Sequence, residues 1–272
     1  MTPSPSRPAR KLHFEFPSET EPELKAWLSE AVPDPSWTQA PENAEILKTA
    51  RQRLVLRIFF GDAHPSLVAK MFPLRNISSM LRYKKYAYQE FCNGQEARAR
   101  GIRVPRPYCY FHRRLFGLVT GSGLVTEDLA GHRDILQLSR TRPGGYLEAS
   151  LLAIPALLSL YHAGVHHVDA RDENILIAPN YDDGTKFSII DWQYAAFFEP
   201  RSDWLLEHLC AHYIRKAPLG EREALLNDWV KRLHGQADMD TPLDIVKQRV
   251  ERLLNARPSV RARLHLKPVG KD

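Results

Sequence analysis

The sequence predicts an α+β protein of two lobes, a small antiparallel β-rich N-lobe with one main helix and a larger, mostly helical C-lobe. Two runs rich in β-branched and aromatic residues, RLVLRIFF (53–60) and SLVAKMF (66–72), flank a Gly-Asp turn signal and predict an antiparallel hairpin. From residue 146 onward the apolar residues recur mainly with helical spacing. The character of the chain changes near residues 127–129, where we expect a hinge between the lobes.

The length and composition are those of an ordinary globular protein. The 272 residues are 43% hydrophobic and 26% charged, and no apolar run approaches the ~20 residues needed to span a bilayer. The N-terminus lacks the apolar segment of a secretory signal, and the three cysteines (Cys92, Cys109 and Cys210) are far apart, so we expect reduced thiols and a cytoplasmic location. A net charge of +6 favours anionic partners.

Three segments are expected along the chain: a partly flexible N-terminal extension (1–45), an N-lobe (46–128) and a C-lobe (129–272). In the N-lobe, a helix is predicted over residues 77–100, with Leu81, Tyr88 and Phe91 on roughly one side and Gly101 as its stop. Two prolines make the next segment, IRVPRPYCYF, an extended connection, and LFGLVTGSGLVTEDL predicts a second hairpin.

In the C-lobe, Tyr146–Gly164 predicts a strongly apolar helix that is interrupted or kinked near Pro155. Two short strands, Ile175–Ile177 and Phe187–Ile190, flank the turn NYDDG, and the pattern is helical from Trp204 onward.

A pattern of oxygen-bearing side chains follows the apolar helix. His167, Asp169 and Asn174 give H-x-D-x-x-x-x-N, and Asp191 comes directly after the second short strand. Phosphoryl transfer needs a carboxylate beside the acceptor hydroxyl and oxygen ligands that hold Mg²⁺ against the nucleotide phosphates. Asp169 suits the first task, and Asn174 and Asp191 suit the second. The stretch therefore predicts a metal–nucleotide site.

This ordered set resembles the catalytic and metal loops of the protein-kinase-like superfamily. Lys70, in VAK at the end of a strand, is similar to the family's phosphate-binding lysine, and Glu90, in YAYQEF on the next helix, takes the place of its ion-pair partner. VTEDL resembles the hinge that binds adenine through backbone groups, here those of Glu127 and Leu129. Asp203, in RSDWL, is similar to an aspartate that braces the catalytic loop.

The resemblance runs from about residue 48 to residue 212 and implies the bilobal protein-kinase-like fold. Within the superfamily, RYKKYAYQEFCNGQEARARGIRVPRPY followed by LVTEDL resembles the lipopolysaccharide core kinases that act on heptose and Kdo (3-deoxy-manno-octulosonic acid). That family implies transfer of a phosphoryl group from ATP, with Mg²⁺, to an inner-core sugar at the cytoplasmic side of the inner membrane. The implied partners are ATP and an anionic glycolipid or sugar, with peripheral contact to the membrane surface.

Several features depart from the protein kinases. LKTARQRLV (47–55) contains no glycine where a glycine-rich phosphate loop is expected, which leaves Arg51 as a source of charge there. The metal motif is Asp-Trp-Gln in place of Asp-Phe-Gly, Val168 replaces an arginine that reads activation-loop phosphate, and no Ala-Pro-Glu segment follows. Phosphorylation-controlled protein-kinase behaviour is therefore not expected.

Some of these residues also have simpler interpretations. Lys70 could be a snorkelling surface lysine, although it lies in a mostly apolar strand, and Glu96 competes with Glu90 for the pairing role. His162 and His166 have i, i+4 spacing but no carboxylate ligand beside them, so a zinc site is disfavoured.

Three further expectations concern charged or titratable side chains. His167 is expected to brace the catalytic loop from the core, and the charges of Glu127 and Asp128 are expected to be incidental. A basic run with no acidic residue before Glu90 is either a solvated face or a surface that attracts anionic substrate or membrane; it comprises Arg75, Arg82, Lys84 and Lys85. No nucleic-acid motif accompanies it, so no nucleic-acid partner is expected.

Two other functions remain open from the sequence. A small-molecule kinase of the aminoglycoside/choline kinase type shares the G-I-x-V-P-x-P element, but its cationic substrates suit an acidic pocket better than a basic run. A catalytically silent, pseudokinase-like binding protein would account for the missing glycines. It would not need Lys70, Asp169, Asn174 and Asp191 together.

Overall fold

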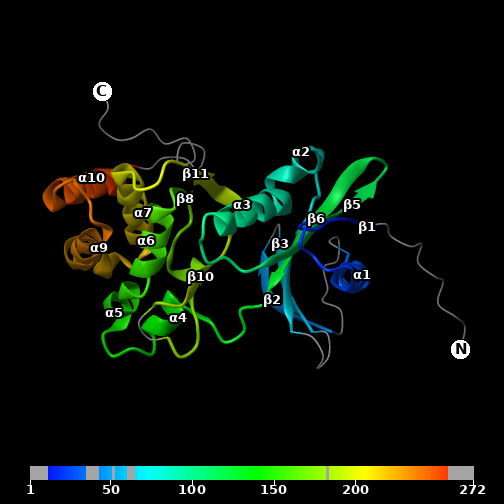
Figure 1. Ribbon diagram of the computed structural model, residues 1–272, viewed down its shortest axis with the longest axis horizontal. Helices are drawn as coiled ribbons and strands as arrows, with labels where there is room; N and C mark the ends of the chain where they lie inside the picture. Colours follow the sequence, from blue (N-terminus) through cyan, green and yellow to red (C-terminus); the bar gives the residue numbers. More distant parts are fainter. Residues whose placement is uncertain (1–11, 35–42, 51–52, 60–64, 182–183, 257–272) are drawn as a thin grey trace, which may run out of the picture. The chain divides into compact units, whose positions relative to one another are not determined.

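Two units make up the chain in the computed structural model, which describes residues 12–34, 43–50, 53–59, 65–181 and 184–256 (Figure 1). Unit 1 comprises residues 1–94 and 105–128, and unit 2 comprises residues 95–104 and 129–272. Helix α3 (Ala87–Ala99) therefore contributes residues to both units.

Unit 1 is built on a six-stranded antiparallel sheet with the strand order β1-β5-β6-β4-β3-β2. Its strands are β1 (Leu12–Glu15), β2 (Ala44–Ala50), β3 (Arg53–Ile58), β4 (Leu67–Pro73), β5 (Pro107–Leu115) and β6 (Leu118–Glu127). β3 buries every second residue, Leu54, Leu56 and Ile58, and this alternation turns one side of the strand toward the core. The predicted pairing of the first two strand runs is confirmed, with Val55 of β3 opposite Lys70 of β4.

The N-terminal residues contribute more to unit 1 than their composition indicates. β1 pairs with β5 at the edge of the sheet, and Phe14 stacks on Phe111 with ring centroids 5.7 Å apart. Helix α1 (Pro22–Ala31) has a proline in its first turn and buries Leu28 in the same hydrophobic core as Leu56. The sequence predicted only a partly flexible extension here, because the alternation of apolar and polar residues in LHFE is just four residues long and follows a start rich in proline and serine.

The prediction of a single helix over residues 77–100 is wrong, because the helix is interrupted in its middle. The chain instead forms α2 (Ile77–Leu81), the 3-10 turn η1 (Tyr83–Lys85) and then α3. Tyr86 has φ −107° and ψ −121°, which lies outside the helical region and interrupts the path. Leu81, expected on the same side as Phe91, is 68% exposed, whereas Phe91 is 5% exposed. Gly101, with φ +82°, follows the end of α3 as predicted.

The second predicted hairpin is present, but its first strand begins earlier than expected. β5 starts at Pro107, inside the segment interpreted as an extended connection, and pairs with β6 up to the turn at Phe116-Gly117. The residue before a proline is restricted to extended conformations that a strand also adopts, so the two interpretations look alike in sequence.

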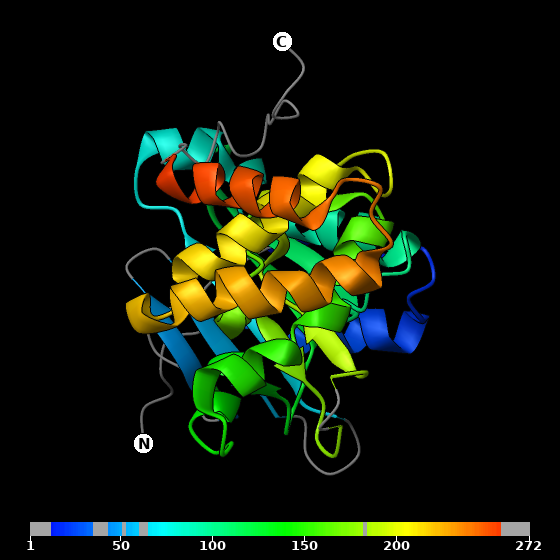
Figure 2. The ribbon, with the colours of Figure 1, turned by 90° about the vertical axis from the view of Figure 1, so that its left-hand side faces the viewer.

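Unit 2 is mainly helical, and Figure 2 shows α10 lying beside α7 and α9. Its helices are α4 (Ile135–Ser139), α5 (Gly145–Leu151), α6 (Ile154–His162), α7 (Asp203–Lys216), α8 (Arg222–Ala224), α9 (Val230–Ala237) and α10 (Leu243–Asn255). The helix predicted over residues 146–164 is the pair α5 and α6, with the break just before Pro155. Their apolar faces share one core with α7, which includes Leu157 and Leu209.

Short strands and turns of unit 2 carry the loops that matter for the site. The strands are β7 (Arg133–Asp134), β8 (Val165–His167), β9 (Ile175–Ile177), β10 (Phe187–Ile189) and β11 (Ala195–Phe197). The 3-10 turns are η2 (Asp172–Asn174), η3 (Trp192–Tyr194) and η4 (Leu219–Glu221), and η5 (Leu225–Trp229) is a π-helix. The predicted fold class, an antiparallel β-rich part followed by a mostly helical part, is confirmed.

Candidate active site

Lys70 and Glu90 form an ion pair inside unit 1. Lys70 lies on β4 between two fully buried residues, and Glu90 lies on α3. The Lys70 Nζ atom is 2.9 Å from Glu90 Oε1 and 2.7 Å from Oε2, and the two side chains are 12% and 7% exposed. Glu96, the competing candidate on α3, pairs instead with Arg100, which directly follows the end of that helix. Glu90 therefore holds the Lys70 ammonium group in one position.

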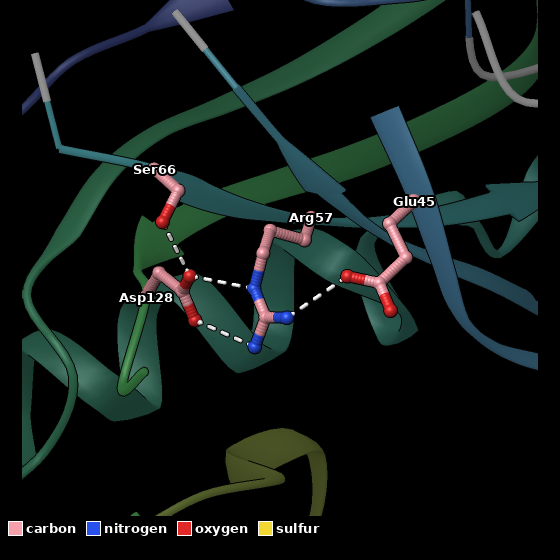
Figure 3. A network of polar contacts seen from close by, with 4 residues as sticks. All are labelled: Glu45, Arg57, Ser66 and Asp128. Atoms are coloured by element: carbon pink, nitrogen blue, oxygen red, sulfur yellow. Dashed lines mark hydrogen bonds and ion pairs between the residues drawn. The ribbon is translucent and has the colours of Figure 1, made fainter. Parts of the chain in front are cut away.

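A polar network fixes the end of β6, where the chain passes from unit 1 to unit 2 (Figure 3). The Asp128 side chain is 4% exposed and accepts hydrogen bonds from Arg57 Nε at 2.7 Å and from Ser66 Oγ at 2.5 Å. Arg57 also donates to Glu45 at 2.9 Å, and its pKa is raised, chiefly by the hydrogen bond to Asp128. The network ties β2, β3 and the residue before β4 to the end of β6.

The expectation that the charges of Glu127 and Asp128 are incidental is therefore wrong. The Glu127 carboxylate accepts a hydrogen bond from the Arg106 amide at 3.1 Å, and the Glu127 amide donates to the Arg106 carbonyl at 2.9 Å. The Leu129 carbonyl accepts from the His132 amide at 3.0 Å. The partners lie 21 and 71 residues away from the two acidic residues, so no local pattern indicates them.

Asp169 and Asn174 lie in the loop between β8 and β9 of unit 2. Asn174 Nδ2 donates to the Asp169 backbone carbonyl at 2.8 Å and to its carboxylate at 3.1 Å. Asn174 is buried, whereas the Asp169 side chain is 35% exposed. Because both bonds use the amide nitrogen, the amide oxygen is the atom of Asn174 that suits a cation. The partly exposed carboxylate of Asp169 is accessible to a hydroxyl.

Backbone bonds bring Asp191 to the same loop. Ile190, just before it, donates its amide to the Asn174 carbonyl at 3.0 Å, and the Tyr194 carbonyl accepts from the Val168 amide at 3.1 Å. Asp191 has a left-handed backbone conformation (φ +68°, ψ +57°), which aspartate adopts more readily than most residues do. The structure therefore brings Asp169, Asn174 and Asp191 into one cluster of loops within unit 2.

His167 supports this cluster from the core, as expected from the sequence. It is fully buried, its Nε2 atom is 3.1 Å from the Ile190 carbonyl oxygen, and its ring packs edge-on against Trp192 at 4.7 Å. Burial lowers the pKa of His167, and the charges of Asp191 and Asp169 act in the opposite direction. The neutral ring thus links the residue before Asp191 to the strand that leads to Asp169.

The contacts of Asp203 differ from those expected, and Arg171 is a further residue of the loop that was not predicted. Asp203, expected to brace the catalytic loop, instead accepts a hydrogen bond from the Thr241 hydroxyl, so it ties α7 to the segment before α10. Arg171 was not singled out by the sequence analysis. Its Nε atom is 3.5 Å from the Asp169 carboxylate, and its Nη2 atom is 2.7 Å from Glu173. A basic residue two positions after the aspartate of H-x-D is the signal that could have identified it.

In the described residues, no group of three or more His, Cys, Asp or Glu side chains could hold a metal ion. Mg²⁺ does not require such a group, because it usually binds one or two protein oxygens together with waters and substrate phosphates. The Asn174 amide and the Asp191 carboxylate are oxygen ligands of that kind, so this pair fits Mg²⁺. Arg51, the candidate for charge at the phosphate loop, lies outside the described residues.

The family model described as "Lipopolysaccharide kinase (Kdo/WaaP) family" matches residues 76–211, half of the 272-residue chain. The chain belongs to this lipopolysaccharide kinase family. No curated protein matches it. A solved structure titled "WaaP in complex with acyl carrier protein" is similar to this lipopolysaccharide kinase over 93% of its chain and 92% of the other, with a TM-score of 0.51 and 18% identity. At that identity the similarity shows a shared fold.

Membership of the family makes the chain a kinase connected with lipopolysaccharide, as the sequence predicted. No helix in the described part of this lipopolysaccharide kinase has the length and hydrophobicity needed to span a bilayer. The roles of Lys70, Glu90, Asp169, Asn174 and Asp191 stay predictions, because the comparisons do not address single residues.

Proposed function

We propose that this lipopolysaccharide kinase transfers the γ-phosphoryl group of ATP to a hydroxyl of an inner-core sugar, heptose or Kdo. The observation that carries the proposal is the loop cluster of unit 2, in which Asp169, Asn174 and Asp191 are held by hydrogen bonds and supported by His167. A protein catalyses phosphoryl transfer mainly by positioning and electrostatic stabilisation. These three side chains supply oxygen atoms of the kinds that such a site needs.

Each side chain has one role in this proposal. The Asp169 carboxylate orients the acceptor hydroxyl and accepts its proton. The Asn174 and Asp191 oxygens hold Mg²⁺, which supplies positive charge beside the transferring group. The Lys70 ammonium binds a phosphate oxygen, and Glu90 keeps that ammonium in place.

The hinge backbone suits an adenine base. The Glu127 amide and the Leu129 carbonyl are engaged with Arg106 and His132, so adenine would use the Glu127 carbonyl as an acceptor and the Leu129 amide as a donor. The network around Asp128 supports this proposal because it holds the end of β6 in place.

A catalytically silent binding protein is the alternative that a specific observation favours, since residues 47–55 contain no glycine. A thermal-shift titration distinguishes the two. We expect ATP with Mg²⁺ to raise the Tm in proportion to the logarithm of nucleotide concentration, and ATP with EDTA to raise it less.

Asp191→Asn should remove most of the difference between the Mg²⁺ and EDTA titrations. Asp228→Asn, an exposed aspartate on η5, is the matched control and should keep it. If neither nucleotide condition shifts the Tm of the wild-type chain, the nucleotide-binding proposal is wrong.

The acceptor and the cellular setting are also proposals. The basic run of unit 1 favours an anionic sugar or glycolipid over the cationic substrates of aminoglycoside and choline kinases. We place the chain in the cytoplasm, at the inner face of the inner membrane. The solved neighbour was studied with an acyl carrier protein, so a carrier protein is a candidate partner that calorimetry can test.

A further inference from the structure

Helix α2 presents an apolar face to solvent. Ile77 and Leu81 are 67% and 68% exposed, and their i, i+4 spacing places them on the same side of the helix. Other sides of the helix are packed, because Ser79, opposite these two residues, is buried, and Met80 joins a hydrophobic cluster that includes Leu74. α2 is therefore attached to unit 1 by one face while its more apolar face remains free of contact with the core.

The tip of the β5–β6 hairpin is the second exposed apolar site of unit 1. Phe116 is 95% exposed, and Leu115 and Leu118 on either side of the turn are 45% and 38% exposed. Phe116 and Gly117 both have positive φ, +48° and +79°, as in a tight two-residue hairpin turn. A polar residue such as asparagine is the usual choice at the first of these positions, so phenylalanine there is costly unless it contacts something.

These two apolar sites lie on neighbouring elements. The Leu74 amide, just before α2, donates to the Thr120 carbonyl of β6 at 3.0 Å, and Val119 of β6 belongs to the same hydrophobic cluster as Leu74. Thr120 is two residues from Leu118 at the turn. Figure 1 shows α2 beside the β5–β6 hairpin. We call Ile77, Leu81, Leu115, Phe116 and Leu118 the apolar tip of unit 1.

Basic side chains surround the apolar tip. Exposed arginines and lysines occur on or beside α2, η1 and the hairpin; they are Arg75, Arg82, Lys84, Lys85 and Arg114. The sequence has no acidic residue from 63 to 89. A pocket of about 480 Å³ opens here and is lined by Arg75 and Arg82 together with Asn76, Ser79 and Tyr86.

We propose that the apolar tip of unit 1 and its basic rim dock on an anionic lipid bilayer. Phe116, Ile77 and Leu81 enter the interface between headgroups and acyl chains, and the basic rim binds lipid phosphates, one of them between Arg75 and Arg82. Exposed apolar side chains bordered by lysine and arginine are the pattern of interfacial membrane binding. The inference rests on the proposed function, because a substrate anchored in lipid is the reason for the enzyme to contact a membrane.

The test is co-sedimentation of the full chain with vesicles of phosphatidylcholine, with and without about one third phosphatidylglycerol. We expect binding to the anionic vesicles that weakens as salt rises, and little binding to the neutral ones. Phe116→Ser and the pair Ile77→Ser/Leu81→Ser should each weaken binding roughly tenfold or more. Lys84→Gln/Lys85→Gln should weaken it roughly fivefold per charge removed.

Matched controls come from unit 2. Leu219→Ser removes a leucine that is 80% exposed, and Lys231→Gln/Arg232→Gln removes two exposed charges; both variants should bind vesicles like the wild type. Equal losses in these controls, or unchanged binding in the tip variants, would overturn the proposal. So would a wild-type chain that ignores anionic vesicles but binds poly-L-glutamate through the same residues, because the surface would then serve an acidic protein.

The same samples separate this inference from the proposed function. Each tip variant is titrated with ATP and Mg²⁺ in the thermal-shift assay without lipid. We expect the wild-type shift in Tm, since the apolar tip contains no proposed nucleotide ligand. Vesicle binding without any nucleotide shift would leave the docking surface intact and remove the proposed activity.

Discussion

Among the single residues of the candidate site, Lys70 and Glu90 are shielded from water and therefore require partners. Lys70 is 12% exposed, lies 5.7 Å from the centroid of the Phe72 ring and is paired with Glu90. Leaving such an ammonium group without its carboxylate costs more than losing a surface ion pair, because the desolvation is no longer compensated. Glu90 thus compensates the desolvated ammonium group of Lys70 and holds it in one position.

Glu90→Gln should lower both nucleotide affinity and stability. We expect ATP affinity to fall roughly tenfold, and the free energy of unfolding to fall by about 1–3 kcal/mol, as the lysine keeps a hydrogen bond but loses its counter-charge. Glu96→Gln, which breaks a more exposed i, i+4 pair with Arg100, should cost less than about 0.5 kcal/mol. Urea unfolding and calorimetry measure the two; equal effects would contradict the role of Glu90.

His112 should make stability depend on pH. It is buried between aromatic rings and accepts a hydrogen bond from Arg114 Nε at 3.1 Å, and burial together with the Arg114 charge lowers its pKa from 6.5 to about 4. The folded state therefore stays neutral where the unfolded state gains a proton. The contribution of neutral His112 to the free energy of unfolding is fully present above pH 6.5. It is lost as the pH falls toward 4, which lowers that free energy by on the order of 1–3 kcal/mol.

The variant His112→Phe isolates this contribution. The free energy of unfolding of the wild type minus that of the variant, measured by urea titration, should fall steadily as the pH decreases from 7 to 4.5. A difference that does not change with pH would show that His112 titrates alike in both states.

At the scale of elements, local sequence predicted most of the strands and helices but missed those that depend on distant contacts. β3, β4, β9 and β10 each carry a run of β-branched or aromatic residues, and α6 carries a helical apolar pattern. β1 is only four residues long, and it forms because β5 offers an edge about 100 residues later. The break between α2 and α3 was missed because every residue from 77 to 100 except Gly94 is tolerated in a helix.

A substitution at Gly164 tests whether the connection between α6 and β8 controls the candidate site. Gly164 joins α6 to β8 with φ +67°, and a Cβ atom there would lie 2.3 Å from the Phe198 carbonyl oxygen. Gly164→Ala should therefore lower the free energy of unfolding by about 2 kcal/mol or more and disturb the pairing of β8 with β11. Urea unfolding and phosphoryl-transfer assays should both detect the change.

Gly235→Ala is the matched control, because Gly235 lies within α9 and a Cβ atom there would meet nothing within 4 Å. We expect this variant to be neutral or more stable by up to about 1 kcal/mol. A Gly164→Ala protein as stable as Gly235→Ala would contradict the tight approach at Phe198.

At the scale of the whole molecule, the sequence predicted the fold class and the family, because the chemistry-bearing residues occur in a characteristic order along the chain. Their surroundings could not be predicted. The support of Asp128 by Arg57 and Ser66 and the partner of Asp203 both depend on residues brought together by folding. The apolar tip was likewise not predicted, because a continuous helix would have placed Leu81 on the same side as Phe91.

In the proposed reaction, Asp169 receives the acceptor's proton while the nucleotide is bound by other residues. The most direct test compares wild type and Asp169→Asn with inner-core lipopolysaccharide, ATP and Mg²⁺, measuring the phosphorylated product by mass spectrometry and nucleotide binding by thermal shift. We expect transfer by the wild type, a loss of roughly a hundredfold or more in the variant, and the same shift in Tm with nucleotide for both proteins. Equal product from both proteins would contradict this role of Asp169.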